Sequence, residues 1–292
     1  MWYWVILFLV GISIGSFLNV VSLRYSSRYS VFSLKNNGGR SRCPHCHKTL
    51  RWFELIPLLS FLVQGGKCRN CIKSLSFQYP FVEVLSGLLF VFIPWYIFVS
   101  RAPFIGFVNG IDPYIETGLY LFVFSVLFLV ALIDYHYHLI PNELNILLIC
   151  AGVLEIIFYE YRGIFQTMQY GVGPYSLIFN GQSSIYINRL VAMMFGAIIT
   201  GIPVFLSHGR VMGLGDFKFA IALGLVFGWP TVIFIIFGAF IIGSCVGIIL
   251  MIAGKKKFRS MLAFGPFLAL SAFIFFFWGE ELLRGYFGLL SP

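Results

Sequence analysis

The chain has 292 residues, of which 59% are hydrophobic and 11% are charged, and its mean hydropathy is +0.91. These values exclude a soluble globular domain and predict an integral membrane protein. The formal net charge of +9 is unevenly distributed, because ten of the twenty basic residues and only one acid, Glu54, lie between Arg24 and Lys73. Dense basic loops beside membrane spans mark the cytoplasmic side, so this bias indicates topology and not nucleic-acid binding.

Apolar stretches close to the bilayer length of about 20 residues recur and predict an all-α polytopic bundle of about eight transmembrane helices. The predicted spans are Trp2 to Leu23, Pro80 to Val99, Gly118 to Ile133, Ile140 to Phe158, Leu190 to Ser207, Val211 to Gly228, Thr231 to Ala253 and Met261 to Trp278. The third, fourth and sixth are short or interrupted by polar residues, so seven or nine crossings remain open. We expect three domains: an anchor over residues 1–23, a small zinc-ribbon-like cytoplasmic loop domain over residues 24–79, and a multi-span bundle over residues 80–292.

The charges at both ends of the chain orient the predicted spans. Met1 to Trp4 carries no basic residue, whereas Arg24 and Arg28 follow the first span. This pattern predicts an uncleaved anchor whose N-terminus lies outside. Counting crossings from the anchor places the basic residues 255–259 inside, as the positive-inside rule requires.

Two aspartates, Asp134 and Asp216, each lie where a hydrophobic span meets a short polar break. A carboxylate inside a membrane costs about 3 kcal/mol at the helix centre and less toward the interface, so such residues usually have a function. The count of crossings puts both on the cytoplasmic side, and puts Asp112 and Glu116 in an external loop over residues 101–117. Two carboxylates at matching depth predict a two-aspartate active site.

The loop domain carries two CxxC pairs, Cys43 with Cys46 and Cys68 with Cys71, which are 21 residues apart. Four thiolates at this spacing close a tetrahedral structural Zn²⁺ site, and a segment this short needs such a staple. Disulfides are disfavoured because a cytoplasmic loop is kept reduced. The alternative is a set of four reduced thiols without metal.

The helix that follows Asp216 has one face of small residues. Counting by fours from this acid gives Ala220, Gly224 and Gly228. Such a face lets transmembrane helices approach closely, so Asp216 should face protein and not lipid. Gly213 and Gly215, in front of the acid, permit unusual backbone angles or a close approach.

The first span has a similar stripe of Gly11, Gly15 and Asn19, which places a buried amide level with the two aspartates. Lys218 lies two residues beyond Asp216, so a regular helix points the two side chains apart. Lys218 either contacts a substrate or another acid, or extends to the phosphate headgroups of lipids. The sequence leaves these alternatives open.

These motifs together resemble those of the bacterial type IV prepilin peptidase (leader peptidase) family, a group of GxGD-type membrane aspartic proteases. The pieces that carry the resemblance appear in family order: GSFLNVV at residues 15–21, SRCPHCHKTLRWFELIPLLS at 41–60, GGKCRNC at 65–71, YPFVEVLSG at 79–87, ALID at 131–134, GLGDFKFAIALGLVFGW at 213–229 and FGPFLAL at 264–270. The ordered set covers nearly all of the chain. Asn142 is a departure, since many relatives carry a second acid after the isoleucine-proline pair.

The resemblance implies an enzyme of the bacterial cytoplasmic (inner) membrane in which Asp134 and Asp216 remove the short basic leader of prepilins and pseudopilins. Scission follows a glycine at the cytoplasmic edge of the substrate's hydrophobic helix, in a type IV pilus or type II secretion system. Many members also methylate the new N-terminal amine with S-adenosylmethionine. The cysteine loop is characteristic of this bifunctional group, and Glu83 lies in a motif shared with it.

Two carboxylates a few Å apart do not both ionise cheaply, so the pair shares one proton near neutral pH. The ionised aspartate activates water and the protonated one stabilises the oxyanion, although the sequence does not assign these roles. Because the leader and the Arg24 to Lys73 loop are both basic, we expect the loop to lie against anionic lipid and the leader to find Asp134, Asp216, Glu83 or Glu143.

Two rival functions remain open on the residues alone. Acids in membrane helices also relay ions or protons, so a transporter or channel would predict flux and no peptide cleavage. A scaffold whose zinc loop recruits a cytosolic partner would make the acids structural. A membrane zinc peptidase is excluded, because the chain has no H-E-x-x-H motif and the expected metal site is closed by cysteines.

Overall fold

The computed structural model describes residues 2–33, 38–101, 110–162, 184–209, 212–255 and 262–290. Over these ranges the chain is nearly all helical, and its only β-type pairings are two isolated bridges in the cysteine loop. The predicted all-α fold class is therefore confirmed. The chain divides into two compact units, Met1–Trp95 and Tyr96–Pro292, which are described one at a time.

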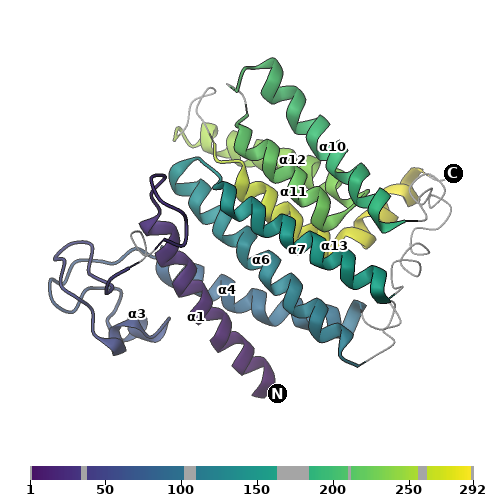
Figure 1. Cartoon of the computed structure of the whole chain (residues 1–292). Coiled ribbons are helices and arrows are strands. Elements are labelled where there is room, and N and C mark those ends of the chain that lie inside the picture. Colours follow the sequence, from purple (N-terminus) through teal and green to yellow (C-terminus); the bar gives the residue numbers. More distant parts are fainter. Residues whose placement is uncertain are drawn as a thin grey trace. The chain divides into compact units, whose positions relative to one another are not determined.

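The N-terminal unit is built on two apolar helices that pack side by side, α1 (Trp2–Arg24) and α4 (Gln78–Trp95) (Figure 1). A Cβ added at Gly11 would lie 2.8 Å from the Cα of Gly87, and one added at Gly15 would lie 2.5 Å from the Cβ of Ser86. The predicted stripe on the first span thus allows close packing. Between the two helices, the cysteine loop contains a 3-10 turn, η1 (Trp52–Leu55), and a short helix, α3 (Leu59–Val63).

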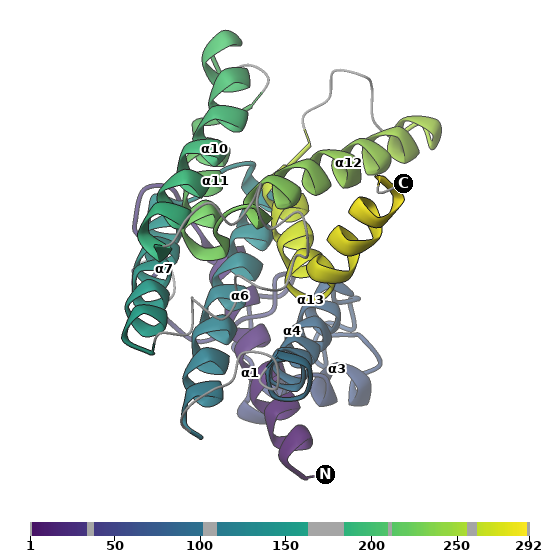
Figure 2. The ribbon, with the colours of Figure 1, turned by 90° about the vertical axis from the view of Figure 1, so that its right-hand side faces the viewer.

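The C-terminal unit starts with a π-helical segment, η2 (Tyr96–Arg101), and continues as a helical bundle (Figure 2). Its helices are α6 (Asp112–Tyr137), α7 (Asn142–Arg162), α10 (Ile185–Leu206), α11 (Leu214–Phe227), α12 (Thr231–Ile252) and α13 (Gly265–Leu290). α7 packs against both α6 and α11, α11 packs against α10, and α13 packs against α6 and α12. The helix α7 therefore lies between the two helices that carry the aspartates.

Within the described residues, six helices are long and apolar enough to cross a membrane, as judged by length and composition. They are Trp2–Arg24, Gln78–Val99, Asp112–Tyr137, Asn142–Arg162, Ile185–Leu206 and Thr231–Ile252. The other two predicted spans are helices as well, but α11 has 14 residues and the apolar part of α13 is Gly265–Gly279. At 1.5 Å per residue, α11 extends about 21 Å, less than the roughly 30 Å of a hydrocarbon core.

The expected external loop over residues 101–117 is wrong in its second half. The structure places Asp112 and Glu116 inside α6, where both side chains are buried. Asp112 pairs with Arg162 of α7 at 2.9 Å, and Glu116 accepts a hydrogen bond from the Tyr159 hydroxyl at 2.8 Å. Because these partners from α7 satisfy the two carboxyl groups, the polar residues Asp112 and Glu116 can be part of α6. Of the basic residues expected inside, 256–259 lie outside the described residues.

The face of small residues on α11 packs against α10. A Cβ added at Gly224 would lie 2.7 Å from the carbonyl oxygen of Ala192, and one added at Gly196 would lie 2.7 Å from that of Ala220. The backbones of the two helices therefore touch, as the small-residue pattern predicts. This close contact fixes the orientation of α11, and with it the position of the first turn, which carries Asp216.

Candidate functional site

Asp134 lies in the last turn of α6, and only 4% of the residue's surface is exposed. The helix ends because His138 takes a left-handed conformation, with φ 53°, and donates its backbone N–H to the Asp134 carbonyl. The side chain of Asp134 is held from another helix: its Oδ2 accepts a hydrogen bond at 2.8 Å from the backbone N–H of Gly265, the first residue of α13. An N–H at a helix start is a favourable partner for an ionised carboxylate.

Asp216 is the third residue of α11, and its Oδ2 accepts a hydrogen bond at 3.2 Å from the backbone N–H of Gly213. Gly213 has φ −79° and ψ 154°, an extended conformation that any residue adopts, so no unusual backbone angle is required there. Gly215 instead serves a close approach, because a Cβ there would lie 3.3 Å from the Cβ of Ile140. Of the two expectations for these glycines, only the close approach at Gly215 applies.

The carboxyl groups of Asp134 and Asp216 lie close enough for their charges to repel each other. The start of α11 lies against the segment that follows α6, since a Cβ at Gly215 would lie 3.3 Å from the Cβ of Ile140. Each carboxyl is also anchored by one backbone N–H of a glycine. Neighbouring carboxyl groups in such a setting favour a singly protonated pair, which can act as base and acid together.

Lys218 points from α11 toward the start of α7. Its Nζ donates a hydrogen bond at 3.0 Å to Oδ1 of Asn142. This partner is an amide of the chain itself, and the predicted contact of Lys218 with a substrate, another acid or a lipid phosphate stays a prediction. Asn142 is also the position at which the chain departs from the family pattern, and the contact shows what an amide does there: it accepts a hydrogen bond from the lysine.

The four loop cysteines converge. The Sγ atoms of Cys43, Cys46, Cys68 and Cys71 all lie within 4.8 Å of one another, and those of Cys43 and Cys71 are 3.9 Å apart. A tetrahedral ion with Zn–S bonds of about 2.3 Å places its sulfur ligands about 3.8 Å apart. The cluster therefore fits a structural Zn²⁺ ion held by four thiolates, with no open position for catalysis.

The two halves of the cluster share one backbone geometry, repeated after 25 residues. Cys43 and Cys68 each donate their N–H to a lysine carbonyl five residues on, at 3.0 and 2.9 Å. In each half, the residue after the second cysteine is left-handed: His47 at φ 55° and Ile72 at φ 59°. Two such turns point their thiols at each other, so the four cysteines of the predicted zinc site lie together.

The surroundings of these thiols alter their pKa values. Backbone N–H groups of Cys71 and Asn70 lower the pKa of Cys68 to about 7, and the backbone N–H of Lys73 lowers the pKa of Cys71. In Cys71, however, burial and three neighbouring thiols outweigh that bond and raise its pKa to about 11. Crowded thiols of this kind resist joint ionisation unless a cation balances them, which favours metal binding.

The remaining predicted site residues, Asn19 and Glu83, belong to the N-terminal unit, whereas both aspartates belong to the C-terminal one. Both side chains are buried. Asn19 Oδ1 accepts a hydrogen bond from Gln78 Nε2 at 3.1 Å, which links α1 to α4. Glu83 Oε2 accepts the backbone N–H of Leu58 at 2.8 Å and so ties the cysteine loop to α4.

A cavity of about 280 Å³ lies between the cysteine loop and helices α1 and α4. Its lining combines two acids, Glu54 and Glu83, with two bases, Arg24 and Arg42, several hydroxyl groups and an apolar wall. The other lining residues that bear on recognition are Ser16, Phe61, Tyr79, Val20, Leu23 and Leu55. An apolar pocket with a few converging polar groups is typical of a small-molecule site.

Sequence reasoning missed Gly265 as a residue of the candidate site. Its backbone N–H matters only through its hydrogen bond to Asp134, which lies 131 positions earlier in the chain. A Cβ at Gly265 would lie 2.8 Å from Asp134 Oδ2. The sequence signals are the FGPFLAL motif at residues 264–270 and, within it, the Gly-Pro pair at the start of the last span, since proline suits the first turn of a helix. The buried pair Glu155 and Arg189 was also missed.

Two family models match the chain. The bacterial peptidase A24 N-terminal domain matches residues 9–97, and the type IV leader peptidase family matches residues 121–248. The first covers the N-terminal unit and the cysteine cluster, and the second covers both aspartates. No solved structure gives a significant match.

Three curated relatives, each named prepilin leader peptidase/N-methyltransferase, match over nearly their full length. The protein of Bacillus subtilis is 28% identical over 96% of both chains. That of Stutzerimonas stutzeri is 27% identical over 95% of this chain and 91% of its own. That of Xanthomonas campestris pv. campestris is 30% identical over 95% of this chain and 92% of its own. The resemblance in the motifs is thus confirmed along the whole sequence, and the chain belongs to the type IV leader peptidase family.

Proposed function

We propose that this chain is a membrane aspartic endopeptidase that removes the basic leader from prepilins and pseudopilins. The observation that carries the proposal is the convergence of Asp134 and Asp216, each anchored by a glycine N–H. Family membership supports the substrate class, because the matching relatives are named prepilin leader peptidases. The basic loop after α1 supports a site facing the cytoplasm of the inner membrane.

The chemistry follows from the singly protonated pair. The ionised aspartate takes a proton from a water molecule as that water attacks the scissile carbonyl carbon. The protonated aspartate donates a hydrogen bond to the developing oxyanion, and its proton passes to the leaving amine as the C–N bond breaks. The Gly265 N–H lies 2.8 Å from Asp134 Oδ2, closer than the 3.2 Å from the Gly213 N–H to Asp216 Oδ2, so it stabilises a negative charge better, and we assign Asp134 as the ionised partner at the start of the reaction.

The substrate's own charges match the site. A basic leader is attracted by Asp134, Asp216 and Glu143, the acid that follows Asn142 at the start of α7. The cysteine loop is basic and repels the leader, so we propose that its lysines and arginines lie against anionic lipid headgroups. A glycine before the scissile bond eases the local unwinding that attack on a helical peptide requires.

The test is reconstitution of the purified chain in liposomes with a prepilin and with the same prepilin carrying Gly→Leu before the scissile bond. We expect mass spectrometry to find a free leader that ends in glycine with the first substrate and little product with the second. Ion and proton flux is measured in the same liposomes. Flux driven by a gradient, with the prepilin left intact, would support a transporter and refute the peptidase.

We also propose that the N-terminal unit methylates the new N-terminal amine, as the names of the relatives indicate for those proteins. S-adenosylmethionine supplies an activated methyl group when it is bound. The lining of the 280 Å³ cavity fits this donor: Glu83 and Glu54 suit its sulfonium and ammonium cations, Arg24 suits its carboxylate, and Phe61 with Tyr79 suits its adenine ring. Glu83 remains the residue expected to matter most, because it is buried and also fixes Leu58.

Direct binding of labelled S-adenosylmethionine tests the cavity without relying on turnover. The variant Val20→Phe fills the cavity from α1, whereas the control Val10→Phe changes an exposed residue of the same helix outside the lining. We expect saturable binding that Val20→Phe abolishes and Val10→Phe retains. Equal binding by both variants would refute the cavity as the donor site, and no binding by the unaltered chain would refute the methyltransferase.

We propose a structural Zn²⁺ ion at Cys43, Cys46, Cys68 and Cys71. The fit of four sulfur atoms to a tetrahedral ion supports this assignment. The ion holds the two cysteine turns together and thereby shapes the wall of the cavity, which Cys43 and Cys68 line. It takes no part in peptide cleavage, because all four of its ligand positions are filled by protein.

A further inference from the structure

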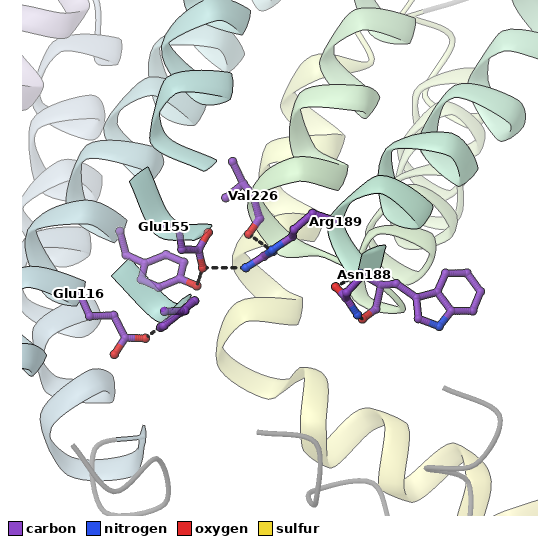
Figure 3. A network of polar contacts seen from close by, with 8 residues as sticks. Glu116, Glu155, Asn188, Arg189 and Val226 are labelled. Atoms are coloured by element: carbon purple, nitrogen blue, oxygen red, sulfur yellow. Dashed lines mark hydrogen bonds and ion pairs between the residues drawn. The ribbon is translucent and has the colours of Figure 1, made fainter. Parts of the chain in front are cut away.

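A second group of buried polar side chains occupies the ends of α6 and α11 that lie opposite the aspartates. At its centre, Arg189 of α10 pairs with Glu155 of α7, with Nη2 3.1 Å from Oε1, and both residues are buried (Figure 3). The Tyr120 hydroxyl of α6 donates to the same Oε1 at 2.7 Å. Ionisable groups inside a membrane bundle are costly, so their presence calls for a function.

This network connects the helix of Asp134 to the helix of Asp216. The second terminal nitrogen of Arg189, Nη1, donates to the carbonyl oxygen of Val226 in the last turn of α11 (Figure 3). One carboxylate oxygen and one guanidinium thus join Tyr120 of α6, through α7 and α10, to α11. At 1.5 Å per residue, Tyr120 lies about 21 Å from Asp134 along α6, and Val226 lies about 15 Å from Asp216 along α11.

The neighbouring residue, Asn188, holds the same end of α11. Its Nδ2 donates to the Trp229 carbonyl at 3.0 Å and its Oδ1 accepts the Trp229 N–H at 3.1 Å. Gly228, which precedes Trp229, has φ +71°. A Cβ there would lie 2.6 Å from Asn188 Oδ1 and 2.9 Å from Arg189 Nη1, so both side chains of α10 approach the backbone at this glycine. The C-terminal end of α11 is therefore held in place by two successive side chains of α10.

A 14-residue helix without proline moves as a rigid rod, so a shift at its C-terminal end displaces its first turn as well. We propose that Arg189 and Glu155 are positioning residues that set the separation of the Asp134 and Asp216 carboxyl groups. The catalytic consequence rests on the proposed peptidase function. The planar guanidinium bonds Glu155 and the Val226 carbonyl at once, which the single ammonium of lysine does not reproduce.

The chain contains a matched control. Arg162 and Asp112 form another ion pair between α6 and α7, at 2.9 Å, and this pair does not include α11. The variants are Arg189→Lys and the double change Glu155→Gln with Arg189→Gln, which leaves no buried charge unpaired. The control is Arg162→Lys. Folding of each is checked by labelled S-adenosylmethionine binding and by thermal unfolding in detergent.

The first readout does not need activity. In a chain carrying Asp134→Cys and Asp216→Cys, a short thiol-reactive cross-linker joins the two introduced thiols, and peptide mapping counts only that product. We expect the cross-linking rate to fall on the order of tenfold when either Arg189 variant is added, since about 1 Å of misplacement has effects of this size or larger. Arg162→Lys should leave the rate unchanged.

The second readout uses the intact aspartates. Arg189→Lys should lower kcat by about tenfold to a hundredfold and leave KM for the prepilin unchanged, because substrate contacts are kept while the reacting groups are displaced. An unchanged cross-linking rate in both Arg189 variants, or an equal fall in the control, would overturn the proposal. If Asp134→Asn still cleaves prepilin, the peptidase proposal fails, but the cross-linking rate still decides the positioning role.

Discussion

The backbone N–H of Gly265 lies 2.8 Å from Oδ2 of Asp134, across 131 positions of the chain. This contact aims the N-terminus of α13 at one of the two aspartates. It also restricts the residue at the helix start, because an added Cβ would lie 2.8 Å from Oδ2 and 3.2 Å from Cγ of Asp134. The position of one of the two proposed catalytic carboxyl groups therefore depends on the absence of a side chain on another helix.

We predict that Gly265→Ala displaces the Asp134 carboxyl and lowers kcat by about a hundredfold, the loss expected for a misplacement of about 1 Å. The measurement is the cleavage rate of a synthetic prepilin by purified variants. Gly118→Ala is the matched control, since Gly118 belongs to the same helix as Asp134 and an added Cβ there meets no atom within 4 Å. Wild-type cleavage by Gly265→Ala would show that the contact has no role.

We predict a bell-shaped pH dependence of kcat/KM for cleavage. Below the optimum both aspartates are protonated and no base remains to activate water; above it both are ionised and no acid remains for the leaving amine. The profile is measured with one prepilin substrate across the acid and alkaline range. A curve that rises with pH to a plateau would instead indicate a single catalytic base.

We predict about one Zn²⁺ ion per chain, lost on substitution of a loop cysteine. Purified protein is measured by metal analysis, and Cys43→Ser should lower the zinc content and expose the loop to proteases. Cys150→Ser and Cys245→Ser are the controls, because these two cysteines are exposed on helices of the C-terminal unit, whereas the cluster belongs to the N-terminal unit. Zinc content that is unaffected by Cys43→Ser would refute the assigned ligands.

We predict that Asn142→Asp stabilises the bundle slightly. Lys218 Nζ lies 3.0 Å from Asn142 Oδ1, and a carboxylate there would turn a neutral acceptor into an ion pair worth up to about 1 kcal/mol on an exposed surface. The free energy of unfolding is compared in a double-mutant cycle with Lys218→Gln. The gain should vanish in the Lys218→Gln background; an equal gain there would mean that the lysine is not the partner.

Within the described residues, each of the eight predicted spans corresponds to a helix, and six of these helices are long and apolar enough to cross a membrane, because a 20-residue apolar run has few alternative structures. Hydropathy did not locate the ends of the helices, because there the pairing of polar side chains decides whether the helix continues. Asp112 and Glu116 look like loop residues until Arg162 and Tyr159 are known to lie beside them. Pattern alone also did not show that α11 has only 14 residues.

The two aspartates could be proposed as candidates from the sequence because an acid in a membrane helix is costly and usually has a function. The cysteine cluster was predictable because its spacing is local. Gly265, and the partner of Lys218, were not, since each acts through a residue more than 70 positions away. The role of Arg189 was not predictable either, because its partners Glu155 and Val226 come from two other helices.

Single-turnover cleavage of a prepilin by Asp134→Asn and by Asp216→Asn tests the central claim most directly. Each change keeps the side-chain volume and removes the titrating group, and retained S-adenosylmethionine binding would show that the N-terminal unit is intact. The two-carboxylate account predicts that each variant alone loses cleavage by a factor on the order of a thousand or more, because neither group can replace the other. Cleavage at a near wild-type rate by either variant would contradict it.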